Sequence, residues 1–226
     1  MKITGGPMRR TFIFVLTLLV CAPLFAQEAK SQEITPAQLW TILEAGNKTF
    51  VAGSIAYTQL KTERSQLAAY QSPPVTILSC SDSRVPPELI FNQSLGTLFV
   101  IRSAGNVVDD FGIASIEYAI AQGYTKLIVV LGHSSCGAVV ASLGGADPAT
   151  PALTALAMRI RSSFVGIPYD SRDPKNVQRA VEMNAKAAAV SLLARSKLIR
   201  DAVLTEKVKI VTANYDLSTG EVKRVD

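Results

Sequence analysis

Short apolar runs alternate with longer amphipathic stretches along most of this chain. The apolar runs cover residues 75–79, 97–101, 126–131 and 208–212, and their length and content are typical of buried parallel strands. The stretches between them carry apolar residues at helical spacing. Strands that alternate with helices predict right-handed crossovers, and hence an α/β fold with a mainly parallel central sheet covered by helices on both faces.

Local start signals support the helical part of this pattern. Thr35-Pro36 supplies a capping residue and a proline at the first helical position, and apolar residues then recur at helical spacing up to Gly53. Further helices are predicted at about residues 60–70, at 111–122 behind Asp110, from Asp173-Pro174 to about Arg195, and just before Glu206. Residues 214–222 indicate a turn into a final edge strand, predicted to be antiparallel, near the C-terminus.

The first 26 residues have the layout of a secretory signal peptide. A basic start with Lys2, Arg9 and Arg10 precedes an almost uncharged run from Thr11 to Ala26. That run is shorter than the ~20 residues that a membrane span needs. We therefore predict a signal peptide at 1–26, one domain at 27–226 and a periplasmic location, with full secretion as the second choice. An uncleaved anchor and export by a twin-arginine route remain as alternatives.

Removal of this segment changes what the charge of the chain implies. The 226 residues carry a formal net charge of +5, and loss of the three basic residues of the signal lowers it to +2. The mature part has no cluster of basic residues interleaved with aromatic ones, which argues against nucleic acid as a partner. It is long enough for one domain with a sizeable core, and no membrane span is expected after cleavage.

Two cysteines and the only histidine of the chain remain in the mature part. Cys80 directly follows the first predicted strand, and His133 and Cys136 follow the third. The carboxyl ends of parallel strands lie at one edge of a sheet, where such folds bind ligands. If the two strands are neighbours, two thiolates and one imidazole converge there, a set typical of an open catalytic Zn²⁺ site. The alternative for two cysteines in an exported protein is a disulfide.

Asp82 and Arg84 sharpen the metal interpretation. A carboxylate two residues after a ligand can form a bidentate pair with a guanidinium two residues further on, which keeps the carboxylate ionised and fixes its direction. Asp82 can then accept a hydrogen bond from water on the metal, or turn and become the fourth ligand in a closed state. Cys136 is expected near the start of a helix through Val139-Val140, where the helix dipole favours a thiolate.

The motif Cys80-x-Asp82-x-Arg84, followed 53 residues after its cysteine by His133-x-x-Cys136, resembles the β-class carbonic anhydrases. The resemblance extends through residues 85–91, 99–106, 115–119 and 215–220, and thus covers roughly residues 35–225. It implies a zinc lyase (carbonate dehydratase) that reversibly hydrates carbon dioxide to bicarbonate and a proton through zinc-bound hydroxide. The N-terminal signal lies outside the resemblance.

The resemblance also implies roles for residues outside the zinc ligands, and a homodimer or higher homo-oligomer. Gln93 is expected to hydrogen-bond the substrate across a dimer interface, and Tyr118 and Phe111 are expected to line the pocket. Some family members close the zinc with the aspartate and are regulated through a Trp-Arg-Tyr bicarbonate site. Arg102 matches that arginine, but the only tryptophan, Trp40, lies inside the first predicted helix, so we expect the open kind.

Three other interpretations remain open at this point. The same zinc ligands would serve a hydrolase acting on carbon disulfide or a related small cumulene. A zinc protein without catalysis is less consistent with the Asp82-Arg84 pair, because a structural site normally has a fourth Cys or His ligand. Loss of zinc with formation of a Cys80–Cys136 disulfide would make the activity sensitive to redox conditions.

Overall fold

The structure is a computed structural model, and it describes residue 2 and residues 33–55, 59–145 and 148–226. The chain divides into two units, residues 1–33 and residues 34–226. All described helices and strands belong to the second unit. The predicted signal peptide lies outside the described residues apart from residue 2, so it stays a prediction. No helix in the described part of the chain is both long and apolar enough to cross a membrane.

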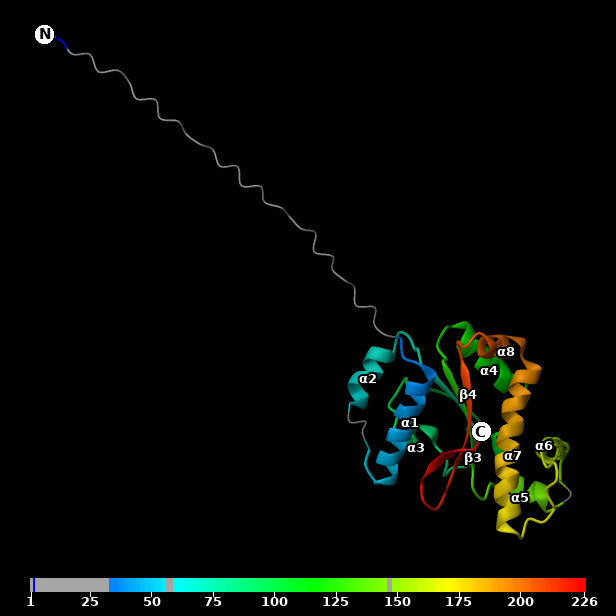
Figure 1. Cartoon of the computed structure of the whole chain (residues 1–226). Coiled ribbons are helices and arrows are strands. Elements are labelled where there is room, and N and C mark those ends of the chain that lie inside the picture. The colour runs from blue at the N-terminus through cyan, green and yellow to red at the C-terminus, as the bar shows by residue number, and fades with distance from the viewer. Residues whose placement is uncertain (1, 3–32, 56–58, 146–147) are drawn as a thin grey trace. The chain divides into compact units, whose positions relative to one another are not determined.

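A five-stranded sheet forms the centre of the second unit (Figure 1). Its strands are β1 (Val75–Cys80), β2 (Leu98–Ser103), β3 (Leu127–His133), β4 (Lys209–Tyr215) and β5 (Val222–Arg224). They lie in the order β2-β1-β3-β4-β5, and only β5 is antiparallel to its neighbour. The α/β fold, the mainly parallel sheet and the antiparallel C-terminal edge strand are therefore confirmed.

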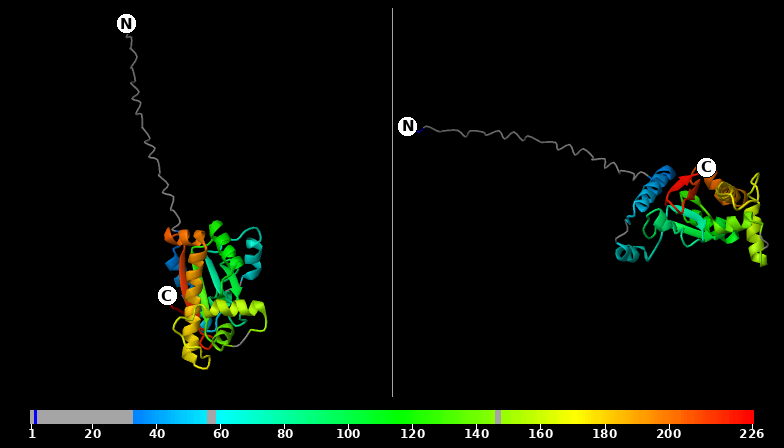
Figure 2. Two further views of the ribbon diagram at one scale, coloured as in Figure 1. Left: turned by 90° about the vertical axis from the view of Figure 1, so that its right-hand side faces the viewer. Right: turned by 90° about the horizontal axis from the view of Figure 1, so that it is seen from below.

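Helices cover both faces of this sheet (Figure 1, Figure 2). Alternate residues of β3 enter two different cores, with Leu127, Val129 and Leu131 on one face and Ile128 and Val130 on the other. The first core is completed by α1 (Pro36–Val51) and α3 (Pro87–Ile90), and the second by α4 (Asp110–Ala121), α7 (Pro174–Arg195) and α8 (Lys197–Leu204). The uninterrupted apolar run of β3 is the consequence of burial on both faces.

Most of the predicted helix boundaries agree with the structure. Thr35 caps α1 in a capping box with Gln38, and Asp173 caps α7 with its side chain. The start of α4 differs by one residue, because Asp109 rather than Asp110 accepts the hydrogen bond from the amide of Gly112. The second helix, α2 (Leu60–Leu67), ends before the predicted residue 70.

A helix that the apolar pattern does not predict, α6 (Pro151–Arg161), lies near the carboxyl ends of the strands. It begins with Thr150-Pro151, the same signal that begins α1, and the Thr150 hydroxyl accepts from the amide of Leu153. Together with α5 (Gly137–Leu143) and the first half of α7, this helix forms a third core cluster that includes Cys80 and Cys136. This cluster buries Cys80 and Cys136.

Helix α1 packs closely against the segment after α3. A methyl group at Gly46 would lie 1.8 Å from the carbonyl oxygen of Phe91, so the helix can approach this closely only with glycine there. The neighbouring side chain, Asn47, donates to the carbonyls of Ile90 and Gly220 and accepts from the amide of Val222. One buried amide thus ties α1 to α3 and to the C-terminal hairpin.

Candidate metal centre

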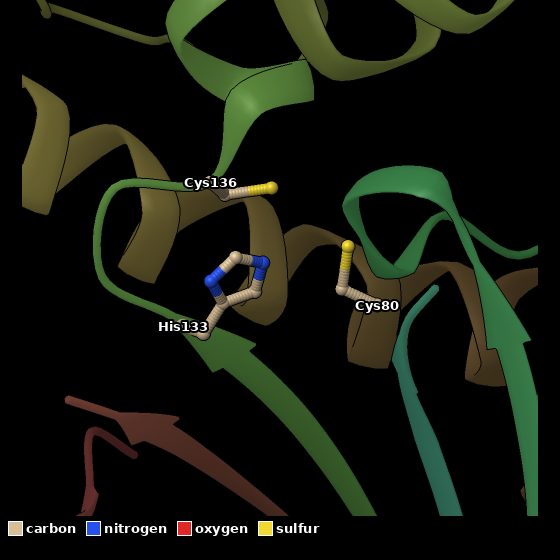
Figure 3. Close-up of side chains that lie close together, drawn as sticks. All are labelled: Cys80, His133 and Cys136. Atoms are coloured by element: carbon tan, nitrogen blue, oxygen red, sulfur yellow. The ribbon is translucent and has the colours of Figure 1, made fainter. Parts of the chain in front are cut away.

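Two neighbouring strand ends bring the three predicted ligands together. Strand β1 ends at Cys80 and the adjacent parallel strand β3 ends at His133. The chain then turns through Ser135, which has a positive φ of 53°, so that Cys136 becomes the N-cap of α5. The ligand atoms of these residues all lie within 4.8 Å of one another, and all three residues are buried. Figure 3 shows both sulfur atoms and the imidazole ring facing one another.

The hydrogen bonding of His133 leaves one ring nitrogen available. Its Nδ1 lies 3.0 Å from the carbonyl oxygen of Ser134, so this nitrogen carries the proton and donates it. The other nitrogen, Nε2, is buried and has no hydrogen-bond partner among the described residues. A buried lone pair beside two cysteine sulfurs is the arrangement that a Zn²⁺ ligand requires. The residues present therefore fit the metal that the sequence predicts.

Both cysteines are free thiols, and one of them is strongly acidified. A hydrogen bond from the Cys136 thiol is the largest cause that lowers the pKa of Cys80 to about 3. The nearby His133 and the backbone amides of Asp82 and Gly105 lower it further, while burial opposes them. The Cys80 thiolate and burial raise the pKa of Cys136 in turn. Without a cation the pair thus shares one negative charge, and a dication would favour the second thiolate.

Asp82 lies beside this cluster and pairs with Arg84. Nε of Arg84 donates to Oδ1 at 2.9 Å and Nη2 donates to Oδ2 at 2.7 Å, while the Arg84 amide donates to Oδ1 at 3.0 Å. These bonds hold the pKa of the Asp82 carboxyl well below its usual range. Oδ2 of Asp82 is also 3.9 Å from Nε2 of His133. An ionised, oriented carboxylate therefore lies next to the free lone pair of the histidine.

Arg102, on β2, contacts the same loop from the other side. Its Nε donates to the carbonyl of Cys80 at 2.9 Å and its Nη2 donates to the carbonyl of Asp82 at 2.6 Å. Trp40 lies elsewhere, on α1, where its side chain enters the first core and the guanidinium of Arg224 is 5.8 Å from the centre of its ring. The open state of the metal and the absence of a bicarbonate site stay predictions.

The three residues expected to contact the substrate lie outside this cluster. Gln93 is partly buried and donates to the carbonyl of Phe91 at 2.9 Å. Tyr118, on α4, packs against Phe99 of β2 and against Tyr124, with ring centres 6.4 and 6.3 Å apart. Phe111, at the start of α4, is 83% exposed. Their roles as substrate-binding residues stay predictions, and for Gln93 the predicted role involves a second subunit.

Gly105 contributes to the site in a way that the sequence analysis does not predict. It lies in the 3₁₀ turn η1 (Ala104–Asn106), and its amide donates to Sγ of Cys80 at 3.3 Å. Its φ of +64° favours glycine, and a Cβ there would lie 2.9 Å from Cδ1 of Ile160 on α6. Asn184 of α7 fixes the turn by donating to the Gly105 carbonyl at 2.7 Å. The sequence Ala104-Gly105-Asn106 was the available signal, since it lies within the resemblance.

Comparison with known proteins supports the resemblance to carbonic anhydrases over most of the chain. The profile of the family described as "Carbonic anhydrase" matches residues 75–222. Carbonic anhydrase 2 of Mycobacterium tuberculosis is 36% identical over 187 residues, which are 82% of this chain and 90% of that protein. The carbonic anhydrase of Mycolicibacterium smegmatis is 34% identical over 199 residues, covering 83% of this chain and 92% of the relative.

Solved structures show the same fold. A tetrameric β-carbonic anhydrase of Sordaria macrospora superposes with a TM-score of 0.65 at 25% identity, covering 84% of this chain and 94% of the other. A β-carbonic anhydrase of Aspergillus fumigatus gives a TM-score of 0.64 at 27% identity, covering 83% and 91%. The family match, the relatives and the strand-end cluster agree, and this chain therefore belongs to the β-class carbonic anhydrases.

Proposed function

We propose that this protein hydrates carbon dioxide reversibly to bicarbonate and a proton, with Zn²⁺ held by Cys80, His133 and Cys136. One observation carries the proposal. Two buried sulfur atoms and the unpartnered Nε2 of His133 lie within 4.8 Å of one another at the carboxyl end of the sheet. Three protein ligands leave a fourth position open, which is the rule for catalytic zinc rather than structural zinc.

Zinc, when bound, supplies a Lewis acid that makes water a nucleophile near neutral pH. The chain orients its ligands through second contacts. Nδ1 of His133 donates to the Ser134 carbonyl, which fixes the ring, and the amides of Asp82 and Gly105 donate to Cys80 at 3.4 and 3.3 Å. Such contacts fix the direction of each ligand and stabilise negative charge on sulfur.

Asp82 is the residue that acts on the reacting water in this proposal. Its carboxylate is acceptor-only while it is ionised, and Arg84 keeps it ionised. The side chain is 16% exposed and the Oδ2 atom lies 3.9 Å from Nε2 of His133. Asp82 can therefore accept a hydrogen bond from the water that attacks carbon dioxide, and orient its lone pair toward the carbon.

The edge strand β2 supports association with a second copy of the chain. It is the outer strand of the sheet on its side, and its side chains are mostly half-buried. Large apolar side chains are exposed close by in sequence at Leu95, Phe111 and Tyr118. The Sordaria relative is tetrameric. We propose a homo-oligomer in which Gln93, Phe111 and Tyr118 complete the substrate pocket across an interface.

The proposed location is the periplasm. The basic start, the uncharged run and the small residue Ala26 support a signal peptide at residues 1–26. The domain from residue 27 onward would then act outside the cytoplasm.

Stopped-flow hydration of carbon dioxide by the zinc-loaded protein tests the activity, with Asp82→Ala measured in parallel. The wild type should hydrate carbon dioxide rapidly. The variant should lose about 100-fold in rate while its zinc content stays at one ion per chain, because the carboxylate acts on water and is not a required ligand. Sedimentation of the same samples reports the number of chains per particle.

Asp170→Ala is the matched control. It removes a carboxylate from an identical Asp-Ser-Arg tripeptide at the surface, and its rate should equal that of the wild type. Bound zinc without hydration from neutral to alkaline pH would contradict the proposal, and would favour the carbon disulfide hydrolase or a non-catalytic zinc protein.

A further inference from the structure

Arg102 spans the loop that carries one metal ligand and the carboxylate. Its Nε and Nη2 donate to the carbonyls of Cys80 and Asp82, at 2.9 and 2.6 Å. These carbonyls flank Ser81, so a single planar group connects the two ends of the segment. Because the donors of a guanidinium are fixed relative to one another, both bonds form together only for a narrow range of carbonyl positions.

The rest of the loop leaves this segment dependent on Arg102. The parallel ladder between β1 and β2 reaches its end where the amide of Ser81 donates to the carbonyl of Ser103 at 3.1 Å. Beyond it, the Asp82 carbonyl also accepts from the amide of Val85 at 3.0 Å, which forms a turn within the loop itself. The Asp82 amide donates to Sγ of Cys80 at the end of β1, and Arg102 is the side chain that ties the Asp82 carbonyl to the neighbouring strand β2.

A shift of this backbone would change the position of the reacting carboxylate. Oδ2 of Asp82 lies 3.9 Å from Nε2 of His133, so a rotation of the peptide at Asp82 moves the carboxylate toward or away from the metal ligands. Arg84 cannot prevent this alone, because it lies in the same loop and would move with the carboxylate. An anchor outside the loop is needed, and Arg102 belongs to a neighbouring strand.

We propose that Arg102 is a positioning residue for carbon dioxide hydration. By holding the backbone between Cys80 and Asp82 against β2, it keeps the Asp82 carboxylate beside the metal ion and outside its ligand set. This inference rests on the proposed function. Both partners of Arg102 are neutral carbonyls, so the role depends on the directions of its N–H donors and not on its positive charge.

Two variants of Arg102 distinguish the effect of its donor geometry from the effect of its positive charge. Arg102→Met keeps an unbranched stem about as long as the arginine side chain up to Nε and removes all donors, while Arg102→Lys keeps the charge and removes the planar fork. Arg172→Met is the matched control, because it removes a guanidinium that is 91% exposed and pairs only with its neighbour Asp170 in the described structure. Thermal unfolding of each variant first establishes that the chain is folded.

The first readouts do not depend on activity. The rate of zinc transfer to a chelator should differ about 10- to 100-fold between each Arg102 variant and the wild type, and should be unchanged in Arg172→Met. Visible spectra of the Co²⁺-loaded proteins, which report the number and kind of ligands, should change in both Arg102 variants and stay unchanged in the control. A role in stability alone would lower the unfolding temperature without altering the spectrum.

Stopped-flow hydration then separates orientation from binding. We expect both variants to lose about 10- to 100-fold in kcat, with KM within about twofold of the wild type, because the carboxylate acts in the reaction and not in substrate binding. An unchanged Co²⁺ spectrum and zinc release in Arg102→Met would overturn the proposal. Full wild-type behaviour of Arg102→Lys would also overturn it, since charge alone would then suffice.

Failure of the proposed function gives a different result. If the zinc-loaded wild type does not hydrate carbon dioxide, the proposed activity is wrong. The spectra and the zinc-release rates still show whether Arg102 holds Asp82 away from the metal. The two conclusions can therefore fail separately.

Discussion

The tripeptide Asp-Ser-Arg occurs twice in this chain, at residues 82–84 and 170–172, and the two copies share two local hydrogen bonds, while a third, from Nη2 to Oδ2, is found at Arg84 alone among these two arginines. In both copies the arginine amide donates to Oδ1 of the aspartate at 3.0 Å. In both, Nε of the arginine donates to the same oxygen, at 2.9 Å in the first copy and 3.0 Å in the second. The local sequence is therefore sufficient to form the ion pair, and it cannot explain why one copy belongs to a reactive site.

The surroundings of the two copies are what differ. Asp82 follows a buried strand, its side chain is 16% exposed, and its Oδ2 lies 3.9 Å from Nε2 of His133. Asp170 lies in the segment before α7 with 38% of its side chain exposed. The comparison teaches that position at the carboxyl end of the sheet, and not the tripeptide, places the carboxylate beside His133, where the proposed function needs it.

The largest effect on activity should come from removing a proposed zinc ligand, because only the first copy lies beside such ligands. Cys136→Ser replaces a soft thiolate ligand by a hydroxyl, so we expect loss of zinc and a fall in hydration of several orders of magnitude. Metal analysis and stopped-flow hydration on the same samples measure both. Ser142→Ala, a buried change six residues further along the chain near the end of α5, should keep zinc and activity. A zinc-replete, active Cys136→Ser would show that the cluster is not the metal site.

A smaller effect on the hydration rate should come from removing the arginine of the first copy, and none from removing that of the second. Arg84→Met frees the Asp82 carboxylate to rotate, and we expect hydration to fall about 10- to 100-fold with zinc retained. Arg172→Met makes the same change in the second copy and should leave the rate unchanged. Equal losses in the two variants would mean that the fold, rather than the site, depends on these pairs.

The smallest effect concerns stability at the second copy. The Arg172 guanidinium holds the pKa of Asp170 below its usual range, so the folded protein binds fewer protons there than the unfolded chain near that pKa. The stabilisation is present above the unfolded pKa of about 3.9 and is lost as pH falls through the folded value. Asp170→Asn should lower the unfolding temperature by about 1 °C or less at neutral pH.

Calorimetry of Asp170→Asn and the wild type from neutral to acidic pH checks the sign. The difference between them should shrink toward zero with acidification. A difference that stays constant would mean that the substitution acts through packing and not through the ion pair.

The sequence predicts most of the fold because its periodicity is strong. The run through Leu127–His133 is apolar without interruption, and capping residues such as Thr35 and Asp173 mark helix starts. Helix α6 is not predicted because its exposed side carries the apolar residues Leu153 and Met158, so that apolar and polar residues are not confined to opposite faces. Its Thr150-Pro151 start is the signal that could have revealed it.

The ligands are predictable for a different reason. Cys80 and His133 end two strands, so the rule that parallel strands place their carboxyl ends together brings them to one edge. Arg102 and Gly105 act through backbone contacts that exist only once β1 pairs with β2 and the turn after β2 folds back. The resemblance marks the positions of both residues, but their contacts cannot be predicted from residue types, since the partner atoms of Arg102 are backbone carbonyls, which every residue has, and the donor of Gly105 is a backbone amide.

Because backbone groups are the same in every residue, the backbone hydrogen bond to the Cys80 sulfur should persist through most substitutions. The amide of Asp82 donates to Sγ, and any amino acid except proline at this position would bring an equivalent amide. Substitution at position 82 can therefore alter the carboxylate without removing the donor to sulfur. Under the proposed function, metal retention and reactivity are thus separable traits, so the rate can vary over evolutionary time through one side chain while the proposed ligand set persists.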